Sequence, residues 1–207
     1  MLDKKLILVG YSGHGLVVAD VALENGLNLV GYIDIEEKKS NPFNLKFLGS
    51  EKNLGIKFFK EPYQFILGIG DINLRKKIAD YINSEGGEFS NIVDSSASIS
   101  KTVTLRKGSF ISKNVAINAF ASIGENCILN TGSIVEHECL LGNNVHISPG
   151  AVLAGNVRVG DDSFIGANAV IKQGVTIGNN VVVGAGSVVI KDIKDNMKIV
   201  GNPGREI

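Results

Sequence analysis

The stretch IGENCI-LNTGSI-VEHECL-LGNNVH, residues 123–146, decides the fold, because an aliphatic residue opens each group of six. The same count runs from Val93 to Val189 without an insertion, through seventeen consecutive hexads. A small or slim side chain follows four residues after each aliphatic one, as Cys127 follows Ile123. Neither the helical period of 3.6 nor the strand period of 2 gives this pattern. We therefore expect stacked, similar units that bury their apolar positions against their neighbours.

A six-residue unit can form a short strand and a turn, so three units would close one triangular coil of about eighteen residues. The large aliphatic residue and the slim one would both point inward, and Gly and Asn stand at the turns, where a left-handed backbone costs little. With strands roughly 4.8 Å apart, five to six coils would make a prism about 25–28 Å long. This is the pattern of a parallel β-helix. Its left-handedness is implied by the resemblance to hexapeptide-repeat proteins, since periodicity does not determine it.

The first ninety residues follow a different pattern, that of a small α/β unit with a parallel sheet, similar to part of a Rossmann fold. We expect domains at residues 1–90 and 91–207, and we assign no structure to residues 36–62. In chain order, the predicted elements are the strand Lys5–Val9, a glycine-rich loop, the helix Leu16–Asn25, the strands Leu29–Ile35 and Phe65–Ile69, and the helix Asn73–Ser84.

The glycine-rich loop, Gly10–Gly15 (GYSGHG), places backbone N–H groups and a helix N-terminus at one point, which favours an anion such as a diphosphate. Asp34, at the end of the next strand, could accept hydrogen bonds from a ribose or a base. The spacing is G-x-x-G-x-G rather than the dinucleotide pattern G-x-G-x-x-G, and the unit is short for a dinucleotide domain. A nucleoside diphosphate fits better. The alternative is a glycine turn that serves only to pack the helix on the strand.

Composition excludes several other classes. The formal net charge is zero with acids and bases interspersed, so we expect no nucleic-acid partner. No apolar run approaches the roughly twenty residues that span a bilayer, and the start MLDKK is not typical of a signal peptide. We therefore expect a cytoplasmic protein with no membrane association. Cys127 and Cys139 both occupy slim inward positions of the hexads, which indicates buried structural thiols rather than a disulfide or a nucleophile.

His137 is the candidate for catalysis on the prism. As the third residue of its hexad it should point outward, between the carboxylates of Glu136 and Glu138. An exposed imidazole beside a carboxylate suits a general base near neutral pH, although an ordinary surface histidine would give the same pattern. Gly155 lies one predicted coil after His137, which would leave room for a thin ligand.

Ala167 and Ala185 stack in the same way on another part of the prism. Rows of small residues also allow close packing of subunits, and a cleft between subunits would need both properties.

Several motifs together resemble one known family. They are Ser12-Gly13-His14-Gly15, the stretch from Asn130-Thr131 to Glu136-His137-Glu138-Cys139, His146, Ala154-Gly155-Asn156-Val157 and Val200-Gly201-Asn202-Pro203. The family is that of the bacterial hexapeptide-repeat sugar acetyltransferases, which includes the UDP-N-acetylbacillosamine and perosamine N-acetyltransferases and the sialic acid O-acetyltransferases. The resemblance covers nearly the whole chain and is strongest over residues 128–204. It implies a homotrimer with an N-terminal nucleotide-sugar domain, and acetyl-CoA bound between β-helices of adjacent subunits.

The resemblance also implies roles for individual residues. His137 would be the general base and Glu138 the carboxylate that increases its basicity. His146 would contact the thioester of acetyl-CoA, and Gly155, Ala167 and Ala185 would lie along its pantetheine arm. The nucleotide sugar would be held by Ser12, Gly13, His14, Asp34, Ile35 and Gly70. Two residues depart from the family pattern in this pocket: Ile35, where bacillosamine-type members can carry a second acid, and Asp71, where an amide is common.

The implied activity is N-acetylation of a UDP-linked 4-amino-4,6-dideoxy sugar for a bacterial surface glycan or glycoprotein, by direct attack on the thioester and without a metal. O-acetylation of sialic acid is the alternative within the family. A zinc hydratase of the γ-carbonic-anhydrase type is disfavoured, because the predicted prism carries two histidines and such a site needs three. A non-catalytic ice-binding solenoid would need a regular threonine ladder, of which only Thr102 and Thr104 are a trace.

Overall fold

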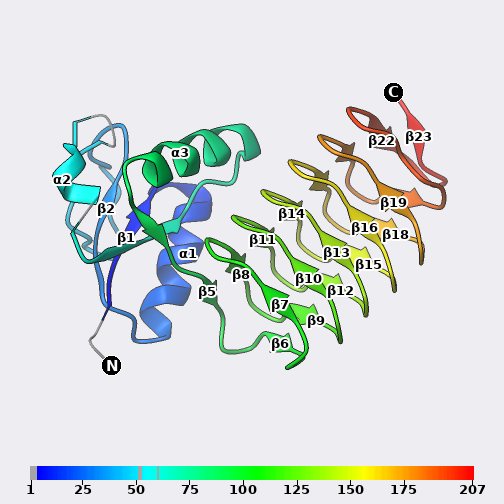
Figure 1. The fold of residues 1–207 in the computed structure, drawn as a ribbon, viewed down its shortest axis with the longest axis horizontal. Helices are drawn as coiled ribbons and strands as arrows, with labels where there is room; N and C mark the ends of the chain where they lie inside the picture. Colours follow the sequence, from blue (N-terminus) through cyan, green and yellow to red (C-terminus); the bar gives the residue numbers. More distant parts are fainter. Residues whose placement is uncertain (1–3, 51–52, 60) are drawn as a thin grey trace. The chain divides into compact units, whose positions relative to one another are not determined.

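A computed structural model describes residues 4–50, 53–59 and 61–207 (Figure 1). The prediction about the stretch MLDKK falls in part on Met1–Asp3, which lie outside the described residues. The contacts between residues divide the chain into two compact units, Met1–Ile92 and Val93–Ile207. No helix in the described part of the chain is long and apolar enough to cross a membrane.

In its described residues, the first unit is a four-stranded parallel sheet with the strand order β2-β1-β3-β4, accompanied by three helices. The buried strands β1 and β3 carry continuous apolar runs, as expected for strands covered on both faces. The elements are β1 (Lys5–Val9), α1 (Gly13–Glu24), β2 (Leu29–Ile33), the short α2 (Ile56–Phe59), β3 (Tyr63–Leu67), α3 (Ile72–Ser84) and β4 (Glu88–Phe89). The predicted order of elements is therefore confirmed.

Some element boundaries differ from the prediction. Tertiary contacts set these boundaries, and the periodicity of the sequence does not show such contacts. Helix α1 begins at Gly13 rather than Leu16, so the second half of the glycine loop is its first turn. Strand β2 ends at Ile33, two residues before the predicted end, because Asp34 turns its carboxylate back onto the chain. In the unassigned segment, Phe47 bridges to Tyr32 and extends the β2 edge of the sheet.

The second unit is a parallel β-helix whose hexapeptide repeats fit a left-handed helix, as predicted (Figure 1). Its two-residue strands form three sheets, and successive strands of a sheet pair eighteen residues apart, as Ile134 pairs with Val152.

We call the three sheets I, II and III, in the order in which the chain visits them. Sheet I contains β5 (Ile92–Val93), β8 (Phe110–Ile111), β11 (Ile128–Leu129), β14 (His146–Ile147), β17 (Phe164–Ile165), β20 (Val182–Val183), β22 (Lys198–Val200) and β23 (Arg205–Glu206). Sheet II contains β6 (Ser98–Ile99), β9 (Ala116–Ile117), β12 (Ile134–Val135), β15 (Val152–Leu153), β18 (Val170–Ile171) and β21 (Val188–Val189). Sheet III contains β7 (Thr104–Leu105), β10 (Ser122–Ile123), β13 (Leu140–Leu141), β16 (Arg158–Val159) and β19 (Thr176–Ile177).

The core of the prism is made by the two inward positions of each hexad. Every large aliphatic position from Ile111 to Val189 is buried, and the three earlier ones pack against the same cluster. At the slim position, Cys127 and Cys139 are buried free thiols, as predicted. Their sulfurs donate to the carbonyls of Gly142 and Ala154, in the same way that Ser163 donates its hydroxyl to Gly178. Serine and cysteine thus serve one structural purpose at this position.

The last coil is shorter than the others. Lys198 pairs with Val182 and Ile193 bridges to Ile177, so the spacing falls from eighteen to sixteen residues. Our pattern assigned Ile193 to a slim position, and this is wrong, because the bridge places Ile193 opposite a large aliphatic position. The two missing residues fall after Val189, where the hexad count ends.

Candidate active site

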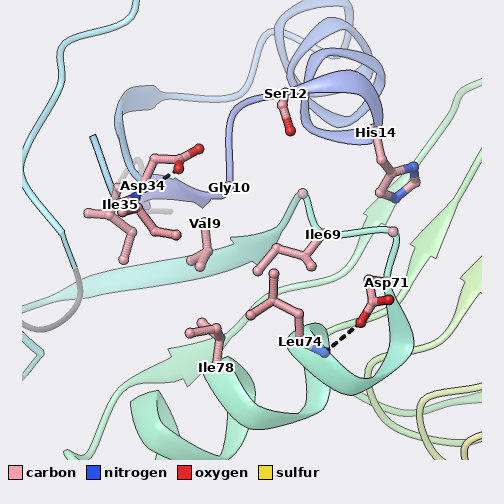
Figure 2. Close-up of a pocket in the computed structure, with 13 residues that line it drawn as sticks. Val9, Gly10, Ser12, His14, Asp34, Ile35, Ile69, Asp71, Leu74 and Ile78 are labelled. Atoms are coloured by element: carbon pink, nitrogen blue, oxygen red, sulfur yellow. Dashed lines mark hydrogen bonds between the residues drawn. The ribbon is translucent and has the colours of Figure 1, made fainter. Parts of the chain in front are cut away.

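A cavity of about 250 Å³ opens at the carboxyl ends of the parallel strands in the first unit (Figure 2). This is where open α/β sheets bind ligands. Five of the six residues predicted to hold a nucleotide line this cavity, while Gly13 does not; the five are Ser12, His14, Asp34, Ile35 and Gly70. Between them, Val9, Ile69, Leu74 and Ile78 give the cavity an apolar wall (Figure 2).

Two helices begin at this cavity, and they differ in whether a side chain caps the backbone N–H groups of the first turn. In α3, the Asp71 side chain accepts a hydrogen bond from the N–H of Leu74 at 2.8 Å, which caps the helix. In α1, Ser12 is the N-cap residue, but its hydroxyl makes no capping hydrogen bond. The first turn of α1 is therefore not capped by the Ser12 side chain, and a helix N-terminus of this kind can bind an anion.

The glycines of the loop serve two separate purposes. A Cβ atom at Gly15 would lie 2.2 Å from the carbonyl oxygen of Gly10, and one at Gly68 would lie 2.3 Å from the same oxygen. These three backbones pack too closely for any side chain. At Gly13, by contrast, an added Cβ would meet nothing within 4 Å. Gly10 and Gly15 therefore serve to pack the helix on the strand, as in the alternative interpretation of the loop. Gly13, by contrast, faces open space.

Asp34 is engaged with the protein itself. One carboxylate oxygen accepts the N–H of Tyr11 at 2.8 Å, and the other accepts the N–H of Ile35 at 2.7 Å and pairs with Lys38 at 2.9 Å. Asp34 thereby joins the loop after β1 to the end of β2. A carboxylate has about four acceptor positions, so room for one ligand hydrogen bond is left.

Behind the cavity lies a buried cation that the sequence analysis missed. Arg75 is fully buried, and its guanidinium donates to the carbonyls of Ile69 and Gly70 at 3.1 and 2.9 Å. The signal was present, because Arg75 shares one helix face with the buried Ala79 and Ile82. Burial, and then the charge of Arg75, lower the pKa of His14 to about 4. His14 is therefore a neutral imidazole at physiological pH.

On the prism, the candidate base and its carboxylate are adjacent in the structure. Nδ1 of His137 lies 3.0 Å from Oε2 of Glu138, and both side chains are half-exposed or more, at 50% and 63%. In this arrangement Nδ1 carries the proton that is donated to the carboxylate, which leaves Nε2 as the acceptor. Both residues lie at the edge between sheets II and III, between β12 and β13.

Gly155 lies directly under the imidazole. A Cβ atom at Gly155 would lie 2.5 Å from both Cε1 and Nε2 of His137. The space left by the missing side chain is therefore occupied by the histidine ring itself. This changes the interpretation of Gly155, which we expected to leave room for a ligand.

The remaining predicted donor residues lie elsewhere on the prism. Ala167 and Ala185 stack at the edge between sheets I and II, where the N–H of Gly186 bonds to the carbonyl of Ala167. His146 lies on β14 in sheet I, largely buried, with its ring edge-on to Phe164 at a centroid distance of 5.1 Å. Within one chain, therefore, His137 and Gly155 lie apart from the other three predicted donor residues, which are His146, Ala167 and Ala185.

No group of three or more His, Cys, Asp or Glu side chains is placed to hold a metal ion within residues 4–50, 53–59 and 61–207.

Comparison with known families matches both parts of the chain. The family described as the PglD N-terminal domain matches residues 5–82. The bacterial transferase hexapeptide family matches residues 120–155 and 138–173, and the hexapeptide repeat of succinyl-transferase matches residues 156–191.

Solved structures match the chain over nearly its whole length. PerB from Caulobacter crescentus, in complex with CoA and GDP-perosamine, is 32% identical with a TM-score of 0.91, covering 98% of this chain and 97% of that one. The acetyltransferase domain of PglB from Neisseria gonorrhoeae is 30% identical with a TM-score of 0.90, covering 99% and 100%. WeeI from Acinetobacter baumannii is 25% identical with a TM-score of 0.88, covering 99% and 100%. With this identity and coverage, the chain belongs to the hexapeptide-repeat sugar acetyltransferases and is an acetyltransferase.

Proposed function

We propose that this protein transfers the acetyl group of acetyl-CoA to the amine of a nucleotide-linked 4-amino-4,6-dideoxy sugar, with UDP as the expected nucleotide. The observation that carries the proposal is the His137–Glu138 pair, whose Nδ1 and Oε2 lie 3.0 Å apart and leave Nε2 as the acceptor. The solved relatives support the substrate class, since PerB was solved with CoA and GDP-perosamine and the PglB domain with acetyl coenzyme A.

The proposed chemistry is one direct displacement. The sugar amine attacks the thioester carbonyl, and Nε2 of His137 accepts the proton that the nitrogen loses. The carbon–sulfur bond then breaks, and the CoA thiolate takes up that proton from the imidazolium to leave as a thiol. Glu138 stabilises the imidazolium through its hydrogen bond to Nδ1. No protein nucleophile is needed, which agrees with the burial of both cysteines.

The first unit would bind the nucleotide part of the substrate. The uncapped start of α1 at Ser12 and Gly13 would receive the diphosphate, as helix N-termini commonly do. The neutral His14 can donate a hydrogen bond without the cost of burying a charge. The apolar wall and the exposed side chain of Ile35 would hold the flat face of the base, with Gly70 opposite and Asp34 as the remaining acceptor.

The donor site would be shared between two copies of the chain. His137 lies at the edge between sheets II and III, and sheet I, which carries His146, is the opposite face of a three-sided prism. A thioester that contacts both histidines therefore needs His137 from one copy and His146 from another. Ala167 and Ala185 would then line the pantetheine arm from the second copy, beside Gly155 of the first. A closed cyclic trimer satisfies this arrangement three times.

The proposal is tested by release of free thiol from acetyl-CoA across a panel of acceptors. The panel contains UDP- and GDP-linked 4-amino-4,6-dideoxy sugars, the corresponding 4-hydroxy sugars, and free sialic acid. We expect turnover only with the amino sugars, and a mass increase of one acetyl group on the product. Turnover of sialic acid alone would overturn the proposal in favour of O-acetylation, and release of thiol with no acceptor dependence would overturn it altogether.

A further inference from the structure

Two residues of the β-helix have a backbone conformation that their side chains disfavour. Phe120 and Glu138 have φ angles of +61° and +60°. Among the described residues, every other non-glycine residue with positive φ is Asn or Asp, the types that tolerate this region best. A bulky aromatic residue in this conformation is unusual, and such outliers cluster at functional sites.

The two outliers are neighbours in space. Phe120 and Glu138 stand eighteen residues apart at the edge between sheets II and III, so they occupy the same corner of successive coils. The N–H of Glu138 donates to the carbonyl of Ala119 at 2.9 Å, which confirms the stacking. One coil earlier, Thr102 accepts the N–H of Phe120 at 2.9 Å and fixes the turn. The backbone of Phe120 thus lies one coil spacing, about 4.8 Å, from the backbone of Glu138, whose carboxylate pairs with His137.

Phe120 is 67% exposed, the highest value among the exposed large hydrophobic residues of the β-helix apart from the C-terminal Ile207. On the other side of His137, the next coil carries Gly155, and the imidazole already fills the space beside it. A large apolar surface therefore borders the catalytic pair on one side alone. Gly155, the proposed donor residue at this edge of the same chain, lies one coil after His137, which leaves the Phe120 side for the acceptor.

We propose that Phe120 is a specificity-determining residue that packs against the apolar face of the acceptor sugar and its C6 methyl group. This inference rests on the proposed function, because it presumes an amino sugar at His137. A 6-deoxy sugar presents a methyl group where an ordinary hexose presents a hydroxymethyl group. An aromatic ring favours the methyl group, since a hydroxyl placed there would lose its hydrogen bonds to water.

The test compares four chains: wild type, Phe120→Tyr, Phe120→Leu and Phe120→Asn. Asparagine occupies the equivalent left-handed position on many other coils, for instance at Asn156 one coil after Glu138. Phe120→Asn therefore removes the ring while relieving the backbone, and its thermal stability should equal or exceed that of the wild type. Phe120→Tyr keeps both the ring and the strain, and serves as the matched control.

We expect Phe120→Asn to raise KM for the 4-amino-4,6-dideoxy sugar nucleotide by about tenfold, with kcat and the KM for acetyl-CoA within about twofold of the wild type. Its preference in kcat/KM for the 6-deoxy over the 6-hydroxy acceptor should fall by about tenfold. Phe120→Leu should lie between, and Phe120→Tyr, which keeps the aromatic ring, should retain most of the 6-deoxy preference.

An unchanged KM and an unchanged 6-deoxy preference in Phe120→Asn would overturn the inference, as would an effect confined to the KM for acetyl-CoA. A wild type that acetylates no amino sugar would instead contradict the proposed function, so the two failures are distinguishable.

Discussion

The imidazole of His137 rests on the backbone of Gly155, and this contact controls the position of the ring. No positive φ constrains Gly155, and the nearest atoms to an added Cβ are those of the imidazole, at 2.5 Å. Alanine at this position would therefore fit the fold and displace the histidine ring, which is the far end of a side chain that can turn away. Nε2, the proposed proton acceptor, is one of the two atoms that would have to move.

We expect Gly155→Ala to lower kcat by about tenfold to a hundredfold, because a misplaced base loses much of its contribution. The melting temperature should change little. The control is the double variant Gly155→Ala with His137→Ala. If Gly155 acts through His137, adding Gly155→Ala to the His137→Ala protein should lower kcat almost no further. Additive losses would show that Gly155 acts independently of the ring.

At the scale of elements, helix α1 and the buried Arg75 of α3 together keep His14 neutral. The folded pKa of His14 is about 4, below the ordinary value of 6.5, because of burial first and of the charge of Arg75 second. The unfolded chain therefore binds more protons than the folded chain between these two values. Stability from this residue is fully present above about pH 6.5 and is lost as pH falls toward about 4.

This linkage predicts that His14→Gln unfolds with a weaker pH dependence than the wild type. The wild type should lose on the order of 3 kcal/mol of unfolding free energy between pH 7 and pH 4 through His14, and the variant should not. Denaturant titrations of both proteins at pH 7, 5.5 and 4.5 measure the difference. Parallel curves of unfolding free energy against pH would show that His14 is not held neutral by the fold.

How far the sequence predicts each element depends on what fixes it. The hexad count predicts the β-helix and both cysteines, because each coil repeats the packing of its neighbour. It fails at Ile193, where two residues drop out of the last coil. The start of α1 was predicted three residues late, because the pattern does not reveal a helix that begins inside a glycine loop. Arg75 is not predicted because an arginine is usually exposed, and its burial depends on the turn before α3, which brings the carbonyls of Ile69 and Gly70 to its guanidinium.

At the scale of the molecule, the proposed donor residues lie on opposite sides of the prism, so the proposed donor site would need two copies of the chain. We expect His137→Ala and His146→Ala proteins to be nearly inactive alone. Co-expressed with two different tags and purified through both, the mixed trimers should regain activity in about one third of their sites. Each restored site takes His137 from one copy and His146 from the next. No recovery in such mixed trimers would place both histidines in sites made by single chains.

The central claim is that His137 is the base for acetyl transfer to a nucleotide-linked amino sugar. The most direct test measures kcat and the Kd for the amino-sugar nucleotide in His137→Ala and the wild type. We expect kcat to fall by about two orders of magnitude or more in His137→Ala, while Kd stays within about twofold of the wild type. Wild-type turnover in His137→Ala would contradict the central claim.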